Sequence, residues 1–199
     1  MDGKIALEEH FAIEATLGDS EVFGAHVWPD LRSRLVDIQT RLVDSMDAYG
    51  LSRIILSLNA PAVQAIADPK RAMAVAQEAN DALAEHVSRR SDRFSAFAAL
   101  PLQEPDAAIQ ELERCVKELK FVGALVNGFT DSGDPNNLLY YDLPQYRPFW
   151  KAVENSTCRS ICIREIRCLD KFPGTEATIG CSARIGLSTL KPRYMLCGS

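Results

Sequence analysis

Four short runs of consecutive apolar residues recur along the first two thirds of the chain. They occupy residues 4–11, 53–59, 94–100 and 121–127. A strand that is apolar throughout is typical of a parallel sheet, because helices or a second layer bury both of its faces. The hydrophobic pattern therefore predicts four buried parallel strands.

The stretches between these runs carry apolar residues every three or four positions, which is the spacing of an amphipathic helix. Asp30 is expected to cap a first helix that ends at Gly50. Pro69 and Pro105 are expected to open the second and third helices, since proline fits the first turn. A shorter helix is expected over residues 144–154. Strand and helix thus alternate four times, which is the pattern of an α/β fold.

Polar side chains collect where the predicted strands end. Glu8 and His10 close the first strand, Asn59 the second and Asn127 the fourth. Because side chains alternate along a strand, Glu8 and His10 are expected to share a face, with Glu9 opposite. A carboxylate beside an imidazole suits a divalent cation such as Zn²⁺, Mn²⁺ or Fe²⁺, and the alternative is a solvated strand end. In parallel α/β folds, ligands bind at this edge.

Charge and composition argue against several classes of protein, among them nucleic-acid-binding and membrane proteins. The formal net charge is −5, which disfavours a surface for nucleic acid or anionic membranes. No apolar run reaches the roughly 20 residues that a membrane span needs. The first residues, interrupted by acidic side chains, do not form a signal pattern, so the cytoplasm is the expected location. No strand is followed by a glycine-rich phosphate motif, which disfavours nucleotide binding.

The six cysteines are unevenly placed, with Cys115 alone in the first three quarters of the chain. Without a secretion signal, a disulfide framework is not expected. A zinc site at Cys158, Cys162 and Cys168 is the alternative, but their spacing fits no usual ligand pattern. Cys115 is expected to pack within a helix.

Several motifs in register resemble the non-oxidative aromatic-acid decarboxylases of the amidohydrolase superfamily. Within that family, the chain most resembles the 2,3-dihydroxybenzoate and γ-resorcylate decarboxylases. The resemblance covers residues 1–155. The motifs that carry it are ALEEHF (6–11), LSLNAPAVQ (56–64), FAALPLQ (97–103), GALVNGF (123–129) and YYDLPQY (140–146).

The resemblance implies the N-terminal half, about four βα units, of a (β/α)₈ TIM-type barrel followed by an irregular tail. It implies one divalent metal, Mn²⁺ or Zn²⁺, a homotetramer or dimer, and non-oxidative decarboxylation of a hydroxybenzoate. Glu8 and His10 match the family's first two metal ligands. Phe23 and Asn127 match positions that line the substrate pocket, and Asn59 either lines that pocket or caps a loop.

The family's remaining site residues match nothing in this chain. They are a histidine in a His-Pro-Arg-Asn-Pro strand, a second downstream histidine and a late aspartate that protonates the ring. No catalytic acid or base is therefore assigned here, and the expected metal site is incomplete. We expect low or no activity from the chain as written.

The family pattern stops at Asn155, and residues 156–199 lack sustained helical or alternating periodicity. Permitted codons for residues 156–169, read with one C placed before them, encode LDVPFYLHPRNPLP. That string contains the missing His-Pro-Arg-Asn-Pro motif. We therefore interpret residues 1–155 as a partial barrel and residues 156–199 as a poorly ordered product of a one-nucleotide frameshift. The fourth strand is then expected to be an unpaired edge.

Two other functions stay open. One is a non-catalytic half-barrel that binds full-length subunits. The other is a different hydrolase or decarboxylase of the same superfamily, although many of those relatives carry His-x-His on the first strand, where this chain has Glu8 and His10.

Overall fold

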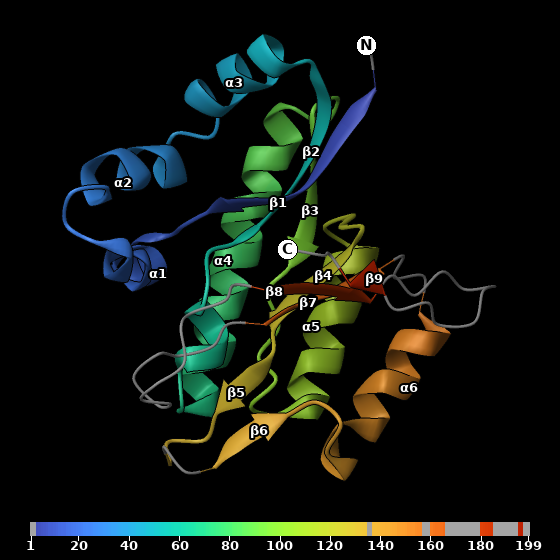
Figure 1. The fold of residues 1–199 in the computed structure, drawn as a ribbon. Helices are drawn as coiled ribbons and strands as arrows, with labels where there is room; N and C mark the ends of the chain where they lie inside the picture. Colours follow the sequence, from blue (N-terminus) through green and yellow to red (C-terminus); the bar gives the residue numbers. More distant parts are fainter. Residues whose placement is uncertain (1–2, 135–136, 157–159, 166–179, 185–194, 197–199) are drawn as a thin grey trace.

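The protein is seen in a computed structural model that describes residues 3–134, 137–156, 160–165, 180–184 and 195–196 (Figure 1). Its centre is a sheet with strand order β1-β2-β3-β4-β7-β8-β9. The first four strands pair in parallel, which confirms the predicted alternation. Their bounds are β1 Lys4–Phe11, β2 Leu51–Leu58, β3 Phe94–Ala98 and β4 Gly123–Asn127.

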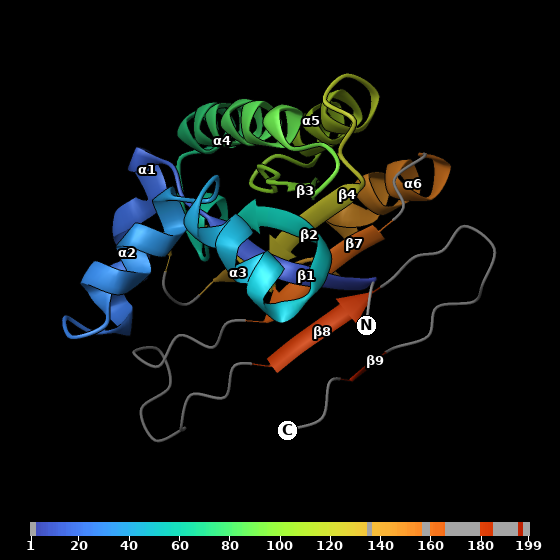
Figure 2. The same cartoon turned by 90° about the horizontal axis from the view of Figure 1, so that it is seen from above.

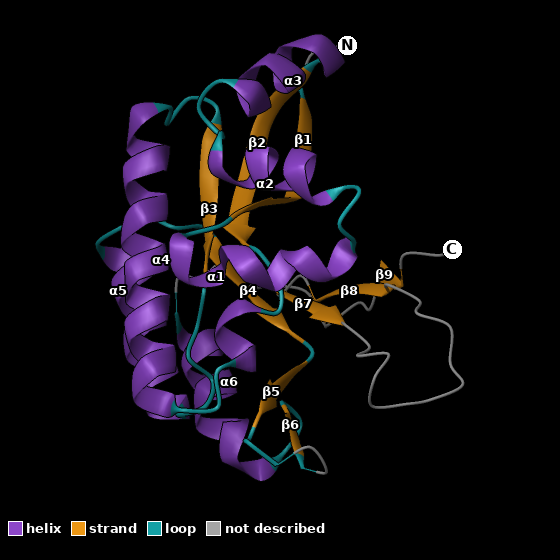
Figure 3. Ribbon diagram, turned by 90° about the vertical axis from the view of Figure 1, so that its left-hand side faces the viewer, coloured by secondary structure: helices purple, strands orange, loops and turns teal. Residues whose placement is uncertain are grey.

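Three helices that follow these strands, α4 (Pro69–Arg89), α5 (Pro105–Lys117) and α6 (Arg147–Asn155), lie along one side of the sheet (Figures 2 and 3). Helix α4 begins as predicted, because the Asp68 carboxylate accepts a hydrogen bond of 2.7 Å from the backbone N–H of Arg71. A line of fully buried side chains from alternate strand positions faces these helices. It comprises Ile54, Leu56, Phe94, Ala96, Ala98, Ala124 and Val126.

The predicted single helix from Asp30 to Gly50 is wrong, because two helices occupy that stretch. They are α2 (Trp28–Val36) and α3 (Arg41–Tyr49). The chain leaves the helical conformation at Asp37, whose carboxylate instead accepts a 3.0 Å hydrogen bond from the backbone N–H of Thr40. Gly50 ends α3 in the left-handed conformation, as predicted, with φ of 68°.

Short elements lie in the connections that the sequence pattern left as loops. After β1 come α1 (Glu14–Leu17) and a 3₁₀ helix, η1 (Gly18–Phe23). After β2 comes η2 (Ala62–Ala65), and η3 (Pro144–Tyr146) precedes α6. Strands β5 (Phe129–Asp131) and β6 (Leu138–Tyr140) form an antiparallel pair after β4.

The segment after Asn155 contributes three strands to the sheet: β7 (Ser160–Glu165), β8 (Gly180–Arg184) and β9 (Met195–Leu196). Strand β7 pairs in parallel with β4 over five residues, so the expectation that β4 is an unpaired edge is wrong. Strands β8 and β9 continue the sheet in the antiparallel direction. The rest of this segment lies outside the described residues, so its predicted disorder stays a prediction.

The sheet face away from these helices has a smaller apolar cluster. It is built on Phe97 and Leu125, with Ile55 packed against them. On β1, by contrast, Ile5 is 56% exposed and Leu7 48% exposed. The four βα units curl into half of a barrel (Figure 2). The exposed Ile5 and Leu7 leave apolar surface of β1 in contact with solvent. Within the described part of the chain, no helix is long and apolar enough to cross a membrane.

Candidate functional site

The first two strands end side by side and bring His10 next to Ser57 on one face of the sheet. Phe11 pairs with Leu58, and both are buried in the main core. His10 and its neighbour Ser57, one position earlier on each strand, therefore face the opposite side. Ser57 Oγ lies 2.9 Å from His10 Nδ1. A hydroxyl at this nitrogen positions the ring, and Nε2 is then the nitrogen that would coordinate a metal.

Glu8 and Glu9 sit where β1 departs from regular pairing. The register against β2 shifts between Ala6 and Glu9, so simple alternation does not decide the direction of Glu8. Glu8 is exposed, whereas Glu9 is partly buried beside Leu56 on the helix side. Burial raises the pKa of the Glu9 carboxyl. The placement of Glu9 agrees with the prediction that its side chain points away from that of His10.

A divalent metal fits this strand end only in part. Glu8 offers an oxygen ligand and His10 a nitrogen ligand, a combination that Mn²⁺ and Zn²⁺ both accept. Among the residues that the structure describes, no group of three or more metal-ligating side chains comes together. Catalytic zinc sites have three protein ligands. The predicted site thus has two candidate ligands among the described residues, Glu8 and His10, and their metal role stays a prediction.

Asn127 ends β4 and is held in one orientation. It is only 6% exposed, and its Nδ2 donates to the Pro61 carbonyl and to Gln64 Oε1, both at 3.0 Å. Its Oδ1 is buried without a hydrogen-bond partner. Leaving a buried acceptor unpaired costs about 1–3 kcal/mol, so this oxygen calls for an explanation. Asn127 lies on the same face of β4 as Leu125, the face away from the helices.

Asn59 ties the segment after β1 to the end of β2. Its Nδ2 donates to the Thr16 carbonyl at 2.8 Å and to Ser20 Oγ at 2.9 Å, while its Oδ1 accepts from the Thr16 hydroxyl. This network anchors η1, which ends at Phe23, to the strand edge. Asn59 therefore holds the loop that carries Phe23, and the pocket role of both residues stays a prediction.

The sequence predictions missed Ser57 and Gln64. Ser57 was hidden inside an aliphatic run, although a lone polar residue there marks the face opposite its apolar neighbours. Gln64 lay in a motif that the resemblance identified, but nothing in the residue itself indicates that it contacts Asn127 across 63 positions.

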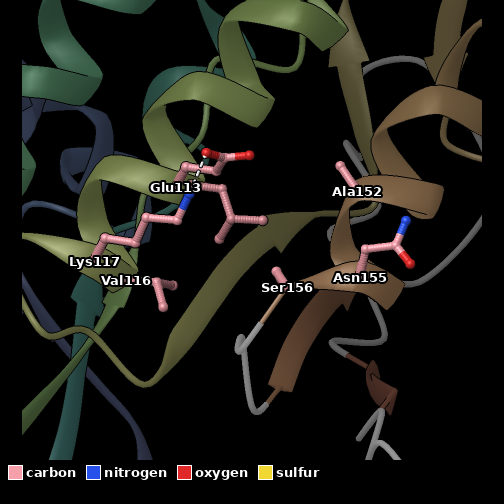
Figure 4. Close-up of a pocket in the computed structure, with 7 residues that line it drawn as sticks. Glu113, Val116, Lys117, Ala152, Asn155 and Ser156 are labelled. Atoms are coloured by element: carbon pink, nitrogen blue, oxygen red, sulfur yellow. Dashed lines mark hydrogen bonds and ion pairs between the residues drawn. The ribbon is translucent and has the colours of Figure 1, made fainter.

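A separate cleft of about 330 Å³ opens between α5 and α6 (Figure 4). Its charged residues, Glu113 and Lys117, form an exposed ion pair at 2.6 Å. It lies between helices and contains none of the predicted site residues. Its lining residues are Leu112, Glu113, Val116, Lys117, Ala152, Asn155 and Ser156.

Cys115 is fully buried in α5, in agreement with a packing role. Burial raises the pKa of its thiol far above the usual range, and the neighbouring Glu111 carboxylate adds to that effect. The thiol is therefore protonated and a poor nucleophile. Of the three cysteines of the alternative zinc site, Cys162 lies in β7, whereas Cys158 and Cys168 lie outside the described residues, so that alternative stays untested.

Comparisons with known proteins all find amidohydrolase-type relatives. A sequence profile described as amidohydrolase matches residues 23–156. The γ-resorcylate decarboxylase of Rhizobium radiobacter is 63% identical over 155 residues, which are 77% of this chain and 47% of that protein. The chain thus spans about half the length of the curated relatives that it matches.

Solved structures give the same result. The dihydroxybenzoic acid decarboxylase of Polaromonas sp. JS666, with bound manganese and the inhibitor 2-nitroresorcinol, is 60% identical with a TM-score of 0.76, covering 78% of this chain and 47% of that one. A 2,6-dihydroxybenzoate decarboxylase in complex with 2,6-dihydroxybenzoate is 61% identical, also with a TM-score of 0.76, covering 78% and 48%.

Proposed function

The chain belongs to the amidohydrolase family, and from that premise we propose that residues 1–155 are the N-terminal half of a metal-dependent, non-oxidative dihydroxybenzoate decarboxylase. The observation that carries this proposal is the 63% identity to a γ-resorcylate decarboxylase across the region that contains Glu8, His10 and Asn127. The substrate is then a small aromatic acid of the 2,6-dihydroxybenzoate type, and the enzyme a carboxy-lyase that works as a homotetramer or dimer.

Glu8 and His10 hold one divalent metal in this proposal, together with ligands from beyond the described residues. Manganese is favoured over zinc, because the Polaromonas relative contains it. When bound, the metal supplies Lewis-acid stabilisation of negative charge on the substrate. Ser57 orients His10, and Phe23 and Asn127 shape the aromatic pocket. The proton that replaces CO₂ on the ring comes from a residue that is not assigned in this chain.

We also propose that residues 156–199 are read in a shifted frame. The family profile stops at residue 156, one residue after the point where the sequence pattern changes. In the shifted reading, the histidine of His-Pro-Arg-Asn-Pro falls at the position of Ile163. That position lies on β7, which pairs in parallel with β4. Sequencing the transcript across the Asn155 codon tests this: an unbroken frame as printed would refute it.

A non-catalytic half-barrel is the second candidate for the chain as printed. The exposed Ile5 and Leu7 and the two-ligand strand end favour it. Binding to a full-length relative would support this role. Decarboxylation by the isolated chain would count against it.

The activity test compares the 199-residue chain with a protein in which the frame after Asn155 is restored. Both are given Mn²⁺ and 2,6-dihydroxybenzoate, and CO₂ release is measured. We expect turnover from the restored protein and little or none from the 199-residue chain. If the restored protein releases no CO₂ from any dihydroxybenzoate, the proposed function is wrong.

A further inference from the structure

We propose that Gln64 is a positioning residue that turns the Asn127 carboxamide so that its oxygen, rather than its nitrogen, is presented to the ligand. That oxygen would then accept a hydrogen bond from a hydroxyl of the proposed dihydroxybenzoate substrate. This inference rests on the proposed function, in which Asn127 lines the substrate pocket.

The orientation is set by a chain of hydrogen bonds that starts at the backbone. Gln64 is 5% exposed, and its Nε2 donates to the Leu100 carbonyl at 2.8 Å. Because a carbonyl can only accept, this bond places the Gln64 nitrogen toward Leu100 and leaves Gln64 Oε1 for Asn127. The Pro61 carbonyl is a second acceptor at 3.0 Å from Asn127 Nδ2. Two acceptors therefore fix the nitrogen of Asn127.

The consequence is that only Asn127 Oδ1 remains to meet a ligand. Both hydrogens of the carboxamide are engaged, and the oxygen is buried without a partner. An amide oxygen accepts a hydrogen bond from a hydroxyl and is repelled by a carboxylate oxygen. Asn127 thus cannot hold the acid group of a benzoate, but it can hold a ring hydroxyl.

Gln103 provides a matched control, because it supports the same short helix without touching Asn127. Its Nε2 donates to the carbonyls of Val63 and Ile66 at 2.6 and 2.7 Å. Gln64 and Gln103 therefore both brace η2, from two sides. Replacing either disturbs that helix, but only the change at Gln64 removes an acceptor of Asn127 Nδ2 and leaves the Pro61 carbonyl to hold the carboxamide alone.

The first test needs no ligand and uses the 199-residue chain. Hydrogen exchange of the Asn127 side-chain amide is followed by NMR in the wild type, in Gln64→Met and in Gln103→Met, with the exposed Asn155 as reference. We expect wild-type Asn127 to exchange at least about tenfold more slowly than Asn155, with protection lost in Gln64→Met and kept in Gln103→Met. Fast exchange in the wild type would overturn the proposal even if Gln64→Met does not fold. So would protection that survives that change.

The second test separates ligand selection from positioning. The metal-free chain is titrated with 2,6-dihydroxybenzoate and with 2,6-difluorobenzoate, which is of similar shape but has no hydroxyl to donate. We expect the dihydroxy acid to bind the wild type at least about tenfold more tightly than the difluoro acid. The ratio of the two dissociation constants should fall toward one in Gln64→Met but not in Gln103→Met. Equal affinity in the wild type would overturn the hydroxyl selection. Binding of neither acid would refute the pocket itself, and the exchange result would still decide the role of Gln64.

Discussion

Replacing Glu8 by glutamine in the frame-restored protein is expected to remove the bound metal and nearly all decarboxylation. A neutral amide is a poor replacement for a carboxylate ligand of a divalent cation. A bound metal contributes several kcal/mol of transition-state stabilisation, which at 1.36 kcal/mol per tenfold corresponds to a rate loss of about 10³-fold. Metal content by mass spectrometry and CO₂ release measure the two effects on the same sample.

Glu9→Gln is the matched control for that change. It neutralises the adjacent carboxylate, which is partly buried beside Leu56 on the helix side of the sheet. We expect Glu9→Gln to keep its metal and most of its activity. Equal losses in both variants would mean that strand β1 tolerates neither change, and retention of metal by Glu8→Gln would show that Glu8 is not a ligand.

Glu111→Ala is expected to destabilise the fold by about 1–3 kcal/mol, the range for leaving buried hydrogen-bond partners unsatisfied, because Arg114 is 24% exposed and keeps its ion pair with Asp81. The Glu111 side chain is 1% exposed and binds Arg114 through both oxygens, at 2.8 and 2.9 Å. It also accepts a 2.7 Å hydrogen bond from Asn80, which in turn pairs with the backbone of Ala99 at the end of β3. Removing the carboxylate leaves buried donors unpaired at the junction of α4, α5 and the sheet.

Glu113→Ala, two residues along the same helix, is the control for Glu111. Glu113 pairs with Lys117 in solvent, where its side chain is 49% exposed. Such a pair is worth about 0.3–0.5 kcal/mol. Urea unfolding of the two variants gives the comparison. Similar midpoints would show that the Glu111 network adds nothing to stability.

The regular part of the fold was predictable because its hydrophobic pattern is unambiguous. The strands are aliphatic at consecutive positions, and the cap at Asp68 and the left-handed Gly50 mark helix ends in the sequence itself. The break between α2 and α3 was not predictable, since the apolar spacing continues across it. Helix α2 ends there because the Asp37 side chain accepts a hydrogen bond from the backbone N–H of Thr40.

The sequence proposes residues for the candidate site but does not contain their contacts. A Glu-x-His triplet at a strand end pointed to a metal, and the family resemblance pointed to Asn127. The roles of Ser57 and Gln64 depend on contacts across 47 and 63 positions, respectively, which no local pattern contains. The pairing of β7 with β4 was missed for a related reason: parallel pairing is decided by a neighbouring strand rather than by the periodicity of the segment.

Metal stoichiometry tests most directly whether Glu8 and His10 are two ligands of a larger metal site. The 199-residue chain and the frame-restored protein are each dialysed against Mn²⁺, and bound metal is counted per chain. We predict close to one Mn²⁺ in the restored protein and far less in the 199-residue chain. A full equivalent in the 199-residue chain, or none in the restored protein, would contradict the assignment.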